Sequence, residues 1–314
     1  MDMTPPVTVW KRDFLLRAIQ SLESSRIPGS WRLRRWFEAR DWMPATEAPI
    51  CCLTNYGVKI VIQPQADRGV ELAIFRTGAY EDGTLAVMAS VLRAGGRFVD
   101  VGANVGLMSL VAARCVGPQG QVDSFEPLPE IRALLTQSLR VNGFGQVRLH
   151  GCALGSAKAT LEISRHPEVN RGSASLAWSA PVAAEKSAVA VERLDDVLGE
   201  AARGSIDMIK VDVEGWEFEA LKGAQGLLSA ERQPVVCIEF STEHALWGGT
   251  HAEMFRTMVD MGYRGFKLAR SKASSSPLVE VAAEALPDHD NLFFFPSRRL
   301  QDFPPGLFAR GLHP

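Results

Sequence analysis

The chain has 314 residues, of which 46% are hydrophobic and 22% charged, and its formal net charge is −2. This composition supports a large buried core and excludes a disordered or fibrous chain. A sequence pI of about 6.3 gives no reason to expect a nucleic acid as the partner.

The cysteines and the apolar segments indicate the cellular compartment. Five cysteines are scattered through hydrophobic surroundings without a CxxC pair, a pattern typical of reduced, buried thiols. No apolar run approaches the roughly 18 to 20 residues that span a bilayer. The first residues, MDMTPPVTVWKRD, lack the apolar core of a secretion signal. We therefore expect a soluble, cytoplasmic protein.

Residues 1–50 predict a helical extension, interrupted at IPGS (27–30) and ended near Pro44 and Pro49. From Lys11 to Arg40 there are eight basic and three acidic residues, interleaved with aromatic ones. Such a stretch is typical of a helical cover whose arginines stay solvated, or of a weak peripheral membrane contact. The sequence does not indicate an oligomeric state.

Residues 51–300 predict one α/β domain, followed by a tail at 301–314. The domain begins with a hairpin at 53–63 and two helical stretches separated near Gly78. Strands and amphipathic helices then alternate, which predicts a doubly wound parallel sheet. The predicted strands are 97–102, 120–127, 146–154, 159–165, 187–194, 205–215, 234–240, 263–269 and 289–296. The predicted helices between them are 105–115, 129–143, 216–229 and 251–262.

The first strand of this series ends in a glycine-containing turn, FVDVGANVG at 98–106. The turn has Asn104 where the dinucleotide fingerprint GxGxxG has its second glycine, and it lacks the Lys-Ser/Thr pair of a P-loop. An adenosine compound without phosphates, such as a sulfonium, fits such a turn better than a dinucleotide. Glu126 lies 20 residues beyond Gly106 at the end of the next strand, where a carboxylate can accept hydrogen bonds from both ribose hydroxyls.

Seven stretches, in order, resemble the FkbM family of S-adenosylmethionine-dependent methyltransferases: GAYEDGT, FVDVGANVG, FEPLPE, VNGFGQVRLHGCALG, NRGSASL, IDMIKVDVEGWEFEALKGA and VVCIEFS. The resemblance covers roughly residues 70–295. It implies the class I methyltransferase (Rossmann-like) fold, with a seven-stranded sheet that is parallel except for its last strand and has helices on both faces. It also implies S-adenosylmethionine as cofactor, and O-methylation of a sugar or natural-product hydroxyl.

The resemblance also implies which residues bind the cofactor. The methionine and ribose part would be lined by Asp100, Gly102, Asn104 and Gly106, and the ribose would be held by Glu126 with its neighbour Pro127. Cys152 and Ala153, at the end of the third predicted strand, would border the adenine. Tyr80 and Glu81 would cap the amino-acid end, unless they only start a helix that packs on the sheet.

Three ionisable residues alternate at the end of the strand at 205–215, namely Lys210, Asp212 and Glu214, so we expect them to share one face. Asp212 is the best candidate for a catalytic residue, because it can meet a sulfonium charge, a substrate hydroxyl or a metal. Lys210 is expected to neutralise a carboxylate. Glu214 either faces the substrate or favours the start of the next helix through the helix dipole.

Two further catalytic candidates follow the next strand. Glu239 stands at its end, and His244 lies in the loop STEHALWGG, where a histidine titrates in the range useful for a general base. His244 is alternatively a surface or helix-capping residue. Asp212 and Glu239 could bind Mg²⁺, but this chain has Glu-Phe where related metal-dependent enzymes carry Asp-Asn, so no metal is expected.

The polar loop HPEVNRGSASLAWSAP resembles the family's substrate-side segment, which implies a substrate role for Asn170 and Ser175. A flexible surface loop is the alternative. The sequence thus predicts an S-adenosylmethionine-dependent O-methyltransferase that acts on a small-molecule or glycan hydroxyl by in-line transfer. Two alternatives stay open: a non-catalytic adenosine-ligand sensor or scaffold, and an N-methyltransferase.

Overall fold

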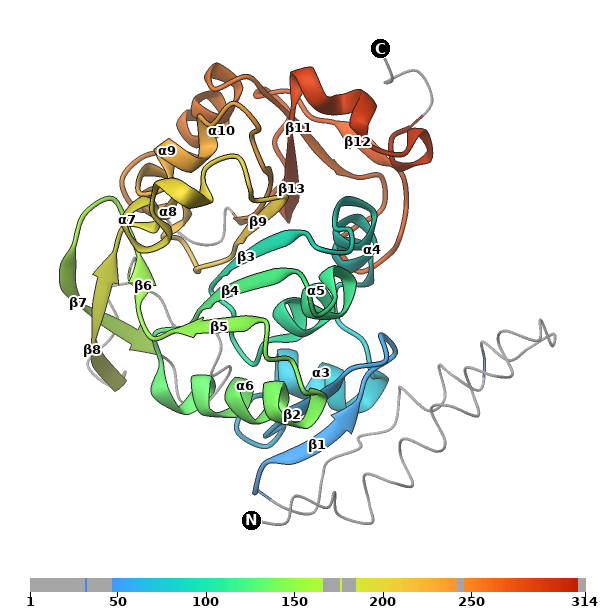
Figure 1. Ribbon diagram of the computed structural model, residues 1–314, viewed down its shortest axis with the longest axis vertical. Coiled ribbons are helices and arrows are strands. Elements are labelled where there is room, and N and C mark those ends of the chain that lie inside the picture. Colours follow the sequence, from blue (N-terminus) through green and yellow to red (C-terminus); the bar gives the residue numbers. More distant parts are fainter. Residues whose placement is uncertain (1–31, 33–46, 166–175, 177–184, 242–245, 310–314) are drawn as a thin grey trace.

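The computed structural model describes residues 32, 47–165, 176, 185–241 and 246–309. The predicted helices of the N-terminal extension therefore lie outside the described residues. Figure 1 shows a large central sheet with helices around it and two smaller sheets beside it. Within the described residues, no helix combines the length and the apolar character that a membrane crossing requires.

The central sheet has eight strands in the order β12-β11-β13-β10-β9-β3-β4-β5. Its strands are β3 (Arg97–Val101), β4 (Gln121–Phe125), β5 (Val147–His150), β9 (Met208–Val211), β10 (Val235–Ser241), β11 (Tyr263–Leu268), β12 (Leu278–Glu280) and β13 (His289–Pro296). Strands β5, β4, β3, β9 and β10 are parallel, whereas β13 runs antiparallel to both of its neighbours, β10 and β11. The class I methyltransferase fold is thus confirmed. The eighth strand, which was not predicted, is the short edge strand β12, antiparallel to β11.

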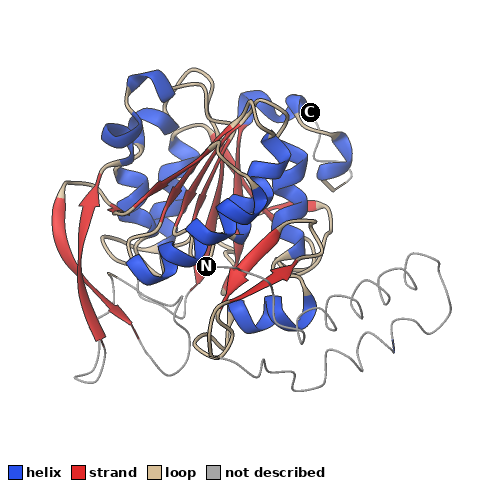
Figure 2. Ribbon diagram, turned by 60° about the horizontal axis from the view of Figure 1, so that its bottom comes forward, coloured by secondary structure: helices blue, strands red, loops and turns tan. Residues whose placement is uncertain are grey.

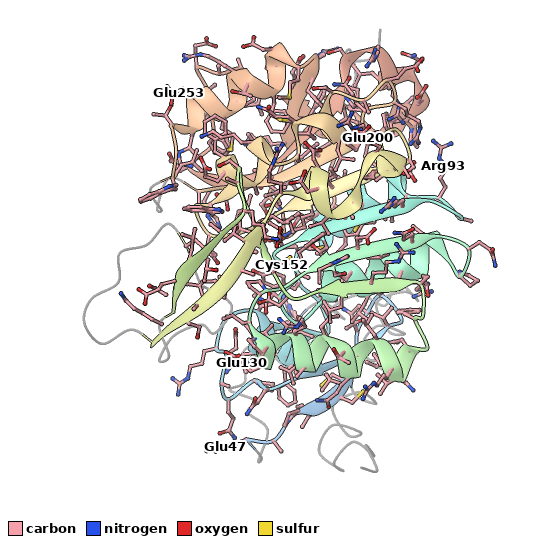
Figure 3. The ribbon with its side chains drawn as sticks, turned by 60° about the vertical axis from the view of Figure 1, so that its left-hand side comes forward. Glu47, Arg93, Glu130, Cys152, Glu200 and Glu253 are labelled. Atoms are coloured by element: carbon pink, nitrogen blue, oxygen red, sulfur yellow. The ribbon has the colours of Figure 1, made fainter. Side chains whose placement is uncertain are left out.

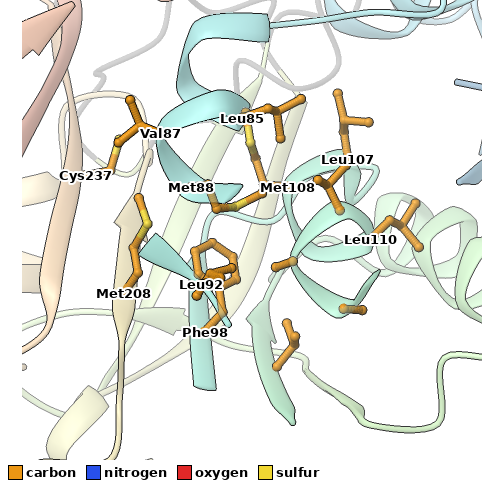
Figure 4. Packing of buried hydrophobic residues seen from close by; sticks show 14 of the residues in the cluster. Leu85, Val87, Met88, Leu92, Phe98, Leu107, Met108, Leu110, Met208 and Cys237 are labelled. Atoms are coloured by element: carbon orange, nitrogen blue, oxygen red, sulfur yellow. The ribbon is translucent and has the colours of Figure 1, made fainter. Parts of the chain in front are cut away.

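Side-chain alternation divides the core into two clusters, one on each face of the sheet. Phe98, Met208 and Cys237 belong to one cluster, while Val99 and Ile209, their neighbours along the strands, belong to the other. The first cluster packs against α3 (Val70–Thr77), α4 (Asp82–Val91), α5 (Leu107–Val116) and α6 (Pro129–Asn142). Figure 4 shows α4 and α5 covering Phe98 and Met208 in this way.

The second cluster packs against short helices that follow β8, β9 and β10. They are α7 (Leu194–Leu198), α8 (Glu217–Lys222), α9 (Gln225–Leu228) and α10 (His251–Asp260), and Figure 2 shows helices on both faces of the sheet. The single helix predicted at 216–229 is wrong, because α8 ends before Gly223. α9 begins only at Gln225, and a Cβ at Gly223 would lie 2.0 Å from the carbonyl oxygen of Gly155, so the connection between the two helices has room for glycine alone at this position.

Two small sheets flank the central one. The hairpin of β1 (Ile50–Leu53) and β2 (Lys59–Ile62) lies against α6, where Val61 N–H donates to Ser138 Oγ at 2.8 Å. The other sheet contains β6 (Ala153–Leu154), β7 (Ala159–Arg165) and β8 (Glu185–Glu192). The single strand predicted at 146–154 is therefore wrong in its second half. β5 ends at His150, and the chain then leaves the large sheet to pair Ala153 with Val191.

The turn after β3 packs closely between the ends of β4 and β9. Gly102 and Ala103 both donate their N–H groups to the carbonyl of Phe125, at 3.1 and 2.9 Å. Gly102 has φ +83°, and a Cβ there would lie 1.9 Å from the carbonyl oxygen of Asp212. Both the backbone conformation and the available space therefore require glycine at this position.

Replacing Gly102 with alanine should destabilise the protein far more than an ordinary Gly→Ala change at positive φ. A Gly143→Ala variant is the matched control, because Gly143 has φ +69° but open space around its Cβ position. We expect a cost of about 1 to 2 kcal/mol for Gly143→Ala from the left-handed backbone alone. Gly102→Ala should cost more, because the backbone of Asp212 must also move. Urea unfolding measures both, and equal costs would contradict the close packing.

Candidate active site

A cavity opens at the carboxyl ends of β3, β4, β9 and β10, the edge at which doubly wound sheets bind their ligands. It encloses about 1170 Å³, part of which is open to solvent. The predicted site residues that line it are Tyr80, Glu81, Asp100, Gly102, Asn104, Gly106, Glu126, Pro127, Cys152, Ala153, Asp212, Glu214 and Glu239. The other three predicted residues, Asn170, Ser175 and His244, lie outside the described residues.

Glu126 joins the glycine turn to the end of β4. Its two carboxyl oxygens accept hydrogen bonds from the N–H groups of Asn104, at 3.0 Å, and Leu128, at 2.9 Å. Asn104 has φ 50°, a left-handed conformation that asparagine tolerates better than most residues. Burial raises the pKa of Glu126 to about 7, although both backbone hydrogen bonds lower it. The remaining lone pairs of this carboxyl group are acceptors at the cavity wall.

Asp100 lies at the base of the turn and is almost fully buried, with 1% exposed. Ser109 Oγ on α5 donates to Asp100 Oδ2 at 2.5 Å and also pairs with Ser124 Oγ at 2.7 Å. Burial raises the pKa of Asp100, while the ammonium group of Lys210 and the hydroxyl of Ser109 lower it. Asp100 is therefore a fixed hydrogen-bond acceptor whose charge is balanced from the neighbouring strand.

Lys210 and Asp212 form a buried ion pair at the end of β9. Their Nζ and Oδ2 atoms are 2.5 Å apart, with 5% of the lysine side chain and 25% of the aspartate side chain exposed. Burial disfavours the charged lysine, but Asp212, Glu81 and Asp100 outweigh it and hold the pKa of Lys210 well above its usual value. Lys210 thus neutralises carboxylates, as expected from the sequence.

The Asp212 carboxyl group of this pair also lies close to the carboxyl groups of Glu214 and Glu239. Oxygens of all three lie within 4.8 Å of one another. Burial raises the pKa of Asp212, but Lys210 and a hydrogen bond from Glu239 lower it further, so Asp212 is ionised. The charge of Asp212 and burial raise the pKa of Glu239, whereas the ammonium group of Lys272 lowers it, so a proton shared by Asp212 and Glu239 favours Glu239. Oxygens so close together could also share a divalent cation, and the absence of a metal stays a prediction.

Glu214 is held in an unusual backbone conformation, with φ 54°. Glu217, which was not predicted to be a site residue, orders this loop by accepting the N–H groups of Val213 and Gly215 at 3.0 and 3.1 Å. Burial and the charge of Asp212 raise the pKa of Glu214 to about 7. The loop thus presents to the cavity a carboxyl group that titrates near neutrality.

Tyr80 and Glu81 lie at the start of α4, and the N-terminal hairpin fixes this corner. The hydroxyl of Tyr56 accepts the N–H of Tyr80 at 3.2 Å and also contacts the carboxylate of Asp82. Glu81 has φ 51°, and its Oε2 accepts a hydrogen bond from Asn291 Nδ2 at 2.8 Å. Tyr80 and Glu81 therefore start a helix and also line the cavity, and their role in capping the cofactor's amino-acid end stays a prediction.

The opposite end of the cavity is apolar. Its side chains are Phe125, Leu128, Ile131, Leu154, Ile163 and Leu176. Cys152 and Ala153 border this end, and Figure 3 shows Cys152 where the chain passes from the central sheet to the β7–β8 hairpin. The faces of a flat, uncharged aromatic ring suit this end, because such surroundings carry little charge.

The parallel sheet, the glycine turn and the acidic residue after β4 together define a class I methyltransferase-type domain. Residues 100–264 match the family model described as the Methyltransferase FkbM domain. This match covers more than half of the chain, which therefore belongs to the FkbM methyltransferase family.

Two curated relatives are similar to this chain. Methyltransferase 1 of Beauveria bassiana (strain ARSEF 2860) is 30% identical over 142 residues, covering 40% of this chain and 57% of that protein. Methyltransferase sdnD of Sordaria araneosa is 33% identical over 153 residues, covering 40% of this chain and 59% of that protein. The match thus spans less than two thirds of the length of each relative.

Among solved structures, the FkbM methyltransferase of Methylobacillus flagellatus KT is 20% identical to this chain. The superposition has a TM-score of 0.39 and covers 71% of this chain and 52% of that one.

The raised pKa of Glu126 predicts that stability falls as pH rises. The folded state binds a proton up to about pH 7, whereas the unfolded carboxyl releases it near pH 4.5. Between these values the folded state holds more protons, so stability decreases with pH, by on the order of 3 kcal/mol at most for this group. Glu126→Gln should show a shallower decrease than the wild type when urea unfolding is measured at several pH values in this window. Parallel curves would contradict the assignment.

Proposed function

We propose that this protein transfers the methyl group of S-adenosylmethionine to a hydroxyl group of a sugar or natural-product acceptor. The observation that carries the proposal is a single cavity in which the glycine turn separates Glu126 at one end from the carboxylates of Asp212, Glu214 and Glu239 at the other. Glu126 can accept hydrogen bonds from a ribose, and the carboxyl groups of Asp212, Glu214 and Glu239 form the acidic end of the same cavity. These two regions match the ribose and the cationic sulfonium part of this cofactor.

The charges at the acidic end favour a cationic ligand. Five carboxyl groups of the described residues lie there or line the adjoining wall: Glu81, Asp100, Asp212, Glu214 and Glu239. Two lysines, Lys210 and Lys272, face them. Because the proton shared by Asp212 and Glu239 favours Glu239, at most four of these carboxyl groups are ionised, against two lysines. The remaining excess of acid suits a molecule with an ammonium and a sulfonium group, since opposite charges in a partly buried site attract strongly.

Four parts of the cofactor have a partner in this arrangement: the ribose, the adenine, the ammonium group and the sulfonium. The ribose hydroxyls would donate to Glu126, and the adenine would lie against Phe125 and Cys152. The ammonium group would meet Glu81, and the sulfonium would lie near the ionised Asp212. The bound cofactor supplies an electrophilic methyl group, and the chain's residues align it with the acceptor.

Among the described residues, Glu214 is the group best suited to take the acceptor's proton. A general base works best when its pKa lies near the working pH, and the pKa of Glu214 is raised to about 7. Asp212 is a weaker base because its pKa is lowered, so its charge would instead stabilise the sulfonium and orient the hydroxyl. With the shared proton on Glu239, this group would donate a hydrogen bond to Asp212.

Calorimetry with S-adenosylmethionine and with NAD, followed by a radiolabelled methyl-transfer assay on hydroxylated and amine acceptors, tests the proposal. Binding of the first ligand alone, with transfer to a hydroxyl, is the expected result. Transfer to nitrogen would indicate an N-methyltransferase. Binding without transfer would favour a sensor, and failure to bind S-adenosylmethionine would refute the cofactor assignment.

Asp212→Asn should lower turnover more than it lowers cofactor affinity. The amide keeps the size of the side chain but removes the charge next to the reacting centre, which costs most in the transition state. Turnover and the calorimetric Kd for S-adenosylmethionine measure the two effects. Glu162→Gln is the control, since Glu162 pairs with Lys186 on the β7–β8 hairpin and is not a lining residue. A fully active Asp212→Asn enzyme would remove Asp212 from the mechanism.

Cofactor affinity should rise with pH through the titration of Glu126. The ionised carboxylate accepts hydrogen bonds from ribose hydroxyls, whereas the protonated form must donate one, so affinity should increase from below to above about pH 7. Glu126→Gln should weaken S-adenosylmethionine about tenfold or more at the upper pH, from the loss of charge-assisted hydrogen bonds. The difference between the two proteins should shrink at low pH. A constant difference would contradict the role of ionised Glu126.

A further inference from the structure

Lys272 joins two sides of the acidic end, although it lies outside the residues that match the FkbM family model. It belongs to the connection between β11 and β12. Its Nζ lies 2.7 Å from Glu239 Oε1 and 3.1 Å from Glu81 Oε1. These two carboxyl groups come from distant parts of the chain, one from the start of α4 and the other from β10.

The backbone of Lys272 is fixed at the same place as its side chain. Its carbonyl oxygen accepts the N–H groups of Gly83 and Thr84 in the first turn of α4, at 2.9 and 3.3 Å. These N–H groups have no partner within the helix. The β11–β12 connection is therefore attached to the start of α4, and 17% of the Lys272 side chain is exposed.

Glu81 depends on this attachment for its position. Asn291 Nδ2 donates to its Oε2, and Lys272 neutralises its Oε1. Only 7% of Glu81 is exposed, so its charge is partly removed from water. Without Lys272, the Glu81 carboxyl group would lie beside Glu239 and near Asp212. Lys210 would then be the remaining lysine among the described residues at the acidic end. A buried carboxylate that loses its partner either takes up a proton or moves toward solvent.

We propose that Lys272 is a positioning residue that holds the carboxyl groups of Glu81 and Glu239 at the edge of the cavity, so that Glu81 receives the ammonium group of the cofactor's amino-acid end. This inference rests on the proposed use of S-adenosylmethionine. It assigns to the β11–β12 connection a part in cofactor binding, exerted through Glu81 rather than by direct contact.

Calorimetry with two ligands and four proteins tests this inference. The proteins are the wild type, Lys272→Met, Glu81→Gln and the double variant, and the ligands are S-adenosylmethionine and S-adenosylhomocysteine. Both ligands carry the ammonium group, but only the first carries a sulfonium. Lys272→Met should weaken both by a similar factor of about ten, as expected for a charged hydrogen-bonded contact. In the Glu81→Gln background the same change should cost less than about twofold, because residues that act as one unit are not additive.

Several outcomes would overturn the inference. Additive losses would mean that Lys272 does not act through Glu81. Tighter binding of S-adenosylmethionine alone would mean that Lys272 acts only by its charge, since removing a cation favours a sulfonium. Unchanged affinity for both ligands would remove Lys272 from the site. If the wild type binds neither ligand, the proposed function itself fails.

Two further variants separate positioning from a loss of folding. Lys267→Met removes a lysine from β11 that makes no ion pair within the described part of the chain, and it should bind both ligands like the wild type. Lys272→Gln serves if Lys272→Met does not fold, because its amide can still donate to a carboxylate but carries no charge. It should show a smaller loss that again disappears in the Glu81→Gln background. Thermal unfolding of each variant verifies that it is folded at the binding temperature.

Discussion

The close approach between the turn after β3 and the loop after β9 is the constraint on which the site depends. Gly102 lies so near the carbonyl of Asp212 that no side chain fits between them. At the same turn, Glu126 accepts the N–H of Asn104. The ends of three neighbouring strands are thus joined by backbone contacts. Because the backbone is fixed, the carboxyl groups of Asp100, Asp212 and Glu126 have defined positions before any ligand binds, which reduces the cost of ordering them.

A second constraint follows from burying so many ionisable groups at one edge of the sheet. Carboxylates near each other in a low-dielectric site cannot all be charged unless cations or protons compensate. The structure uses both means. Lys210 and Lys272 lie against Asp212, Glu81 and Glu239, and the proton of the Asp212–Glu239 pair favours Glu239. Asp212 therefore stays ionised beside the cavity, where the cationic groups of the proposed cofactor would meet it.

The sequence predicted the parts of this structure that local patterns encode. The alternation of strands and helices in the sequence predicted the parallel sheet. The spacing from Gly106 to Glu126 predicted two residues that line the same cavity. The sequence did not identify Lys272 as a site residue, because its partner Glu81 lies almost 200 residues earlier in the chain. Glu217 was also missed although its partners Val213 and Gly215 are local, because the sequence does not show that the loop between them turns at positive φ. The break after His150 was missed because a strand-like pattern does not reveal that its second half pairs with Val191 in another sheet.

The location of Glu214 shows why backbone strain and chemistry coincide at the cavity. A non-glycine residue with φ 54° is disfavoured, whereas its neighbour Gly215 adopts φ 97° without steric cost, so the strain in this loop lies at Glu214 and needs a restraint from neighbouring residues. Glu217 supplies the restraint through two backbone hydrogen bonds, although its own burial raises its pKa to about 7. The restrained loop thus holds the Glu214 carboxyl group in the cavity, close to that of Asp212. If Glu214 is the base of the proposed methyl transfer, a relaxed loop would lose this position, and a general base contributes only when it is well placed.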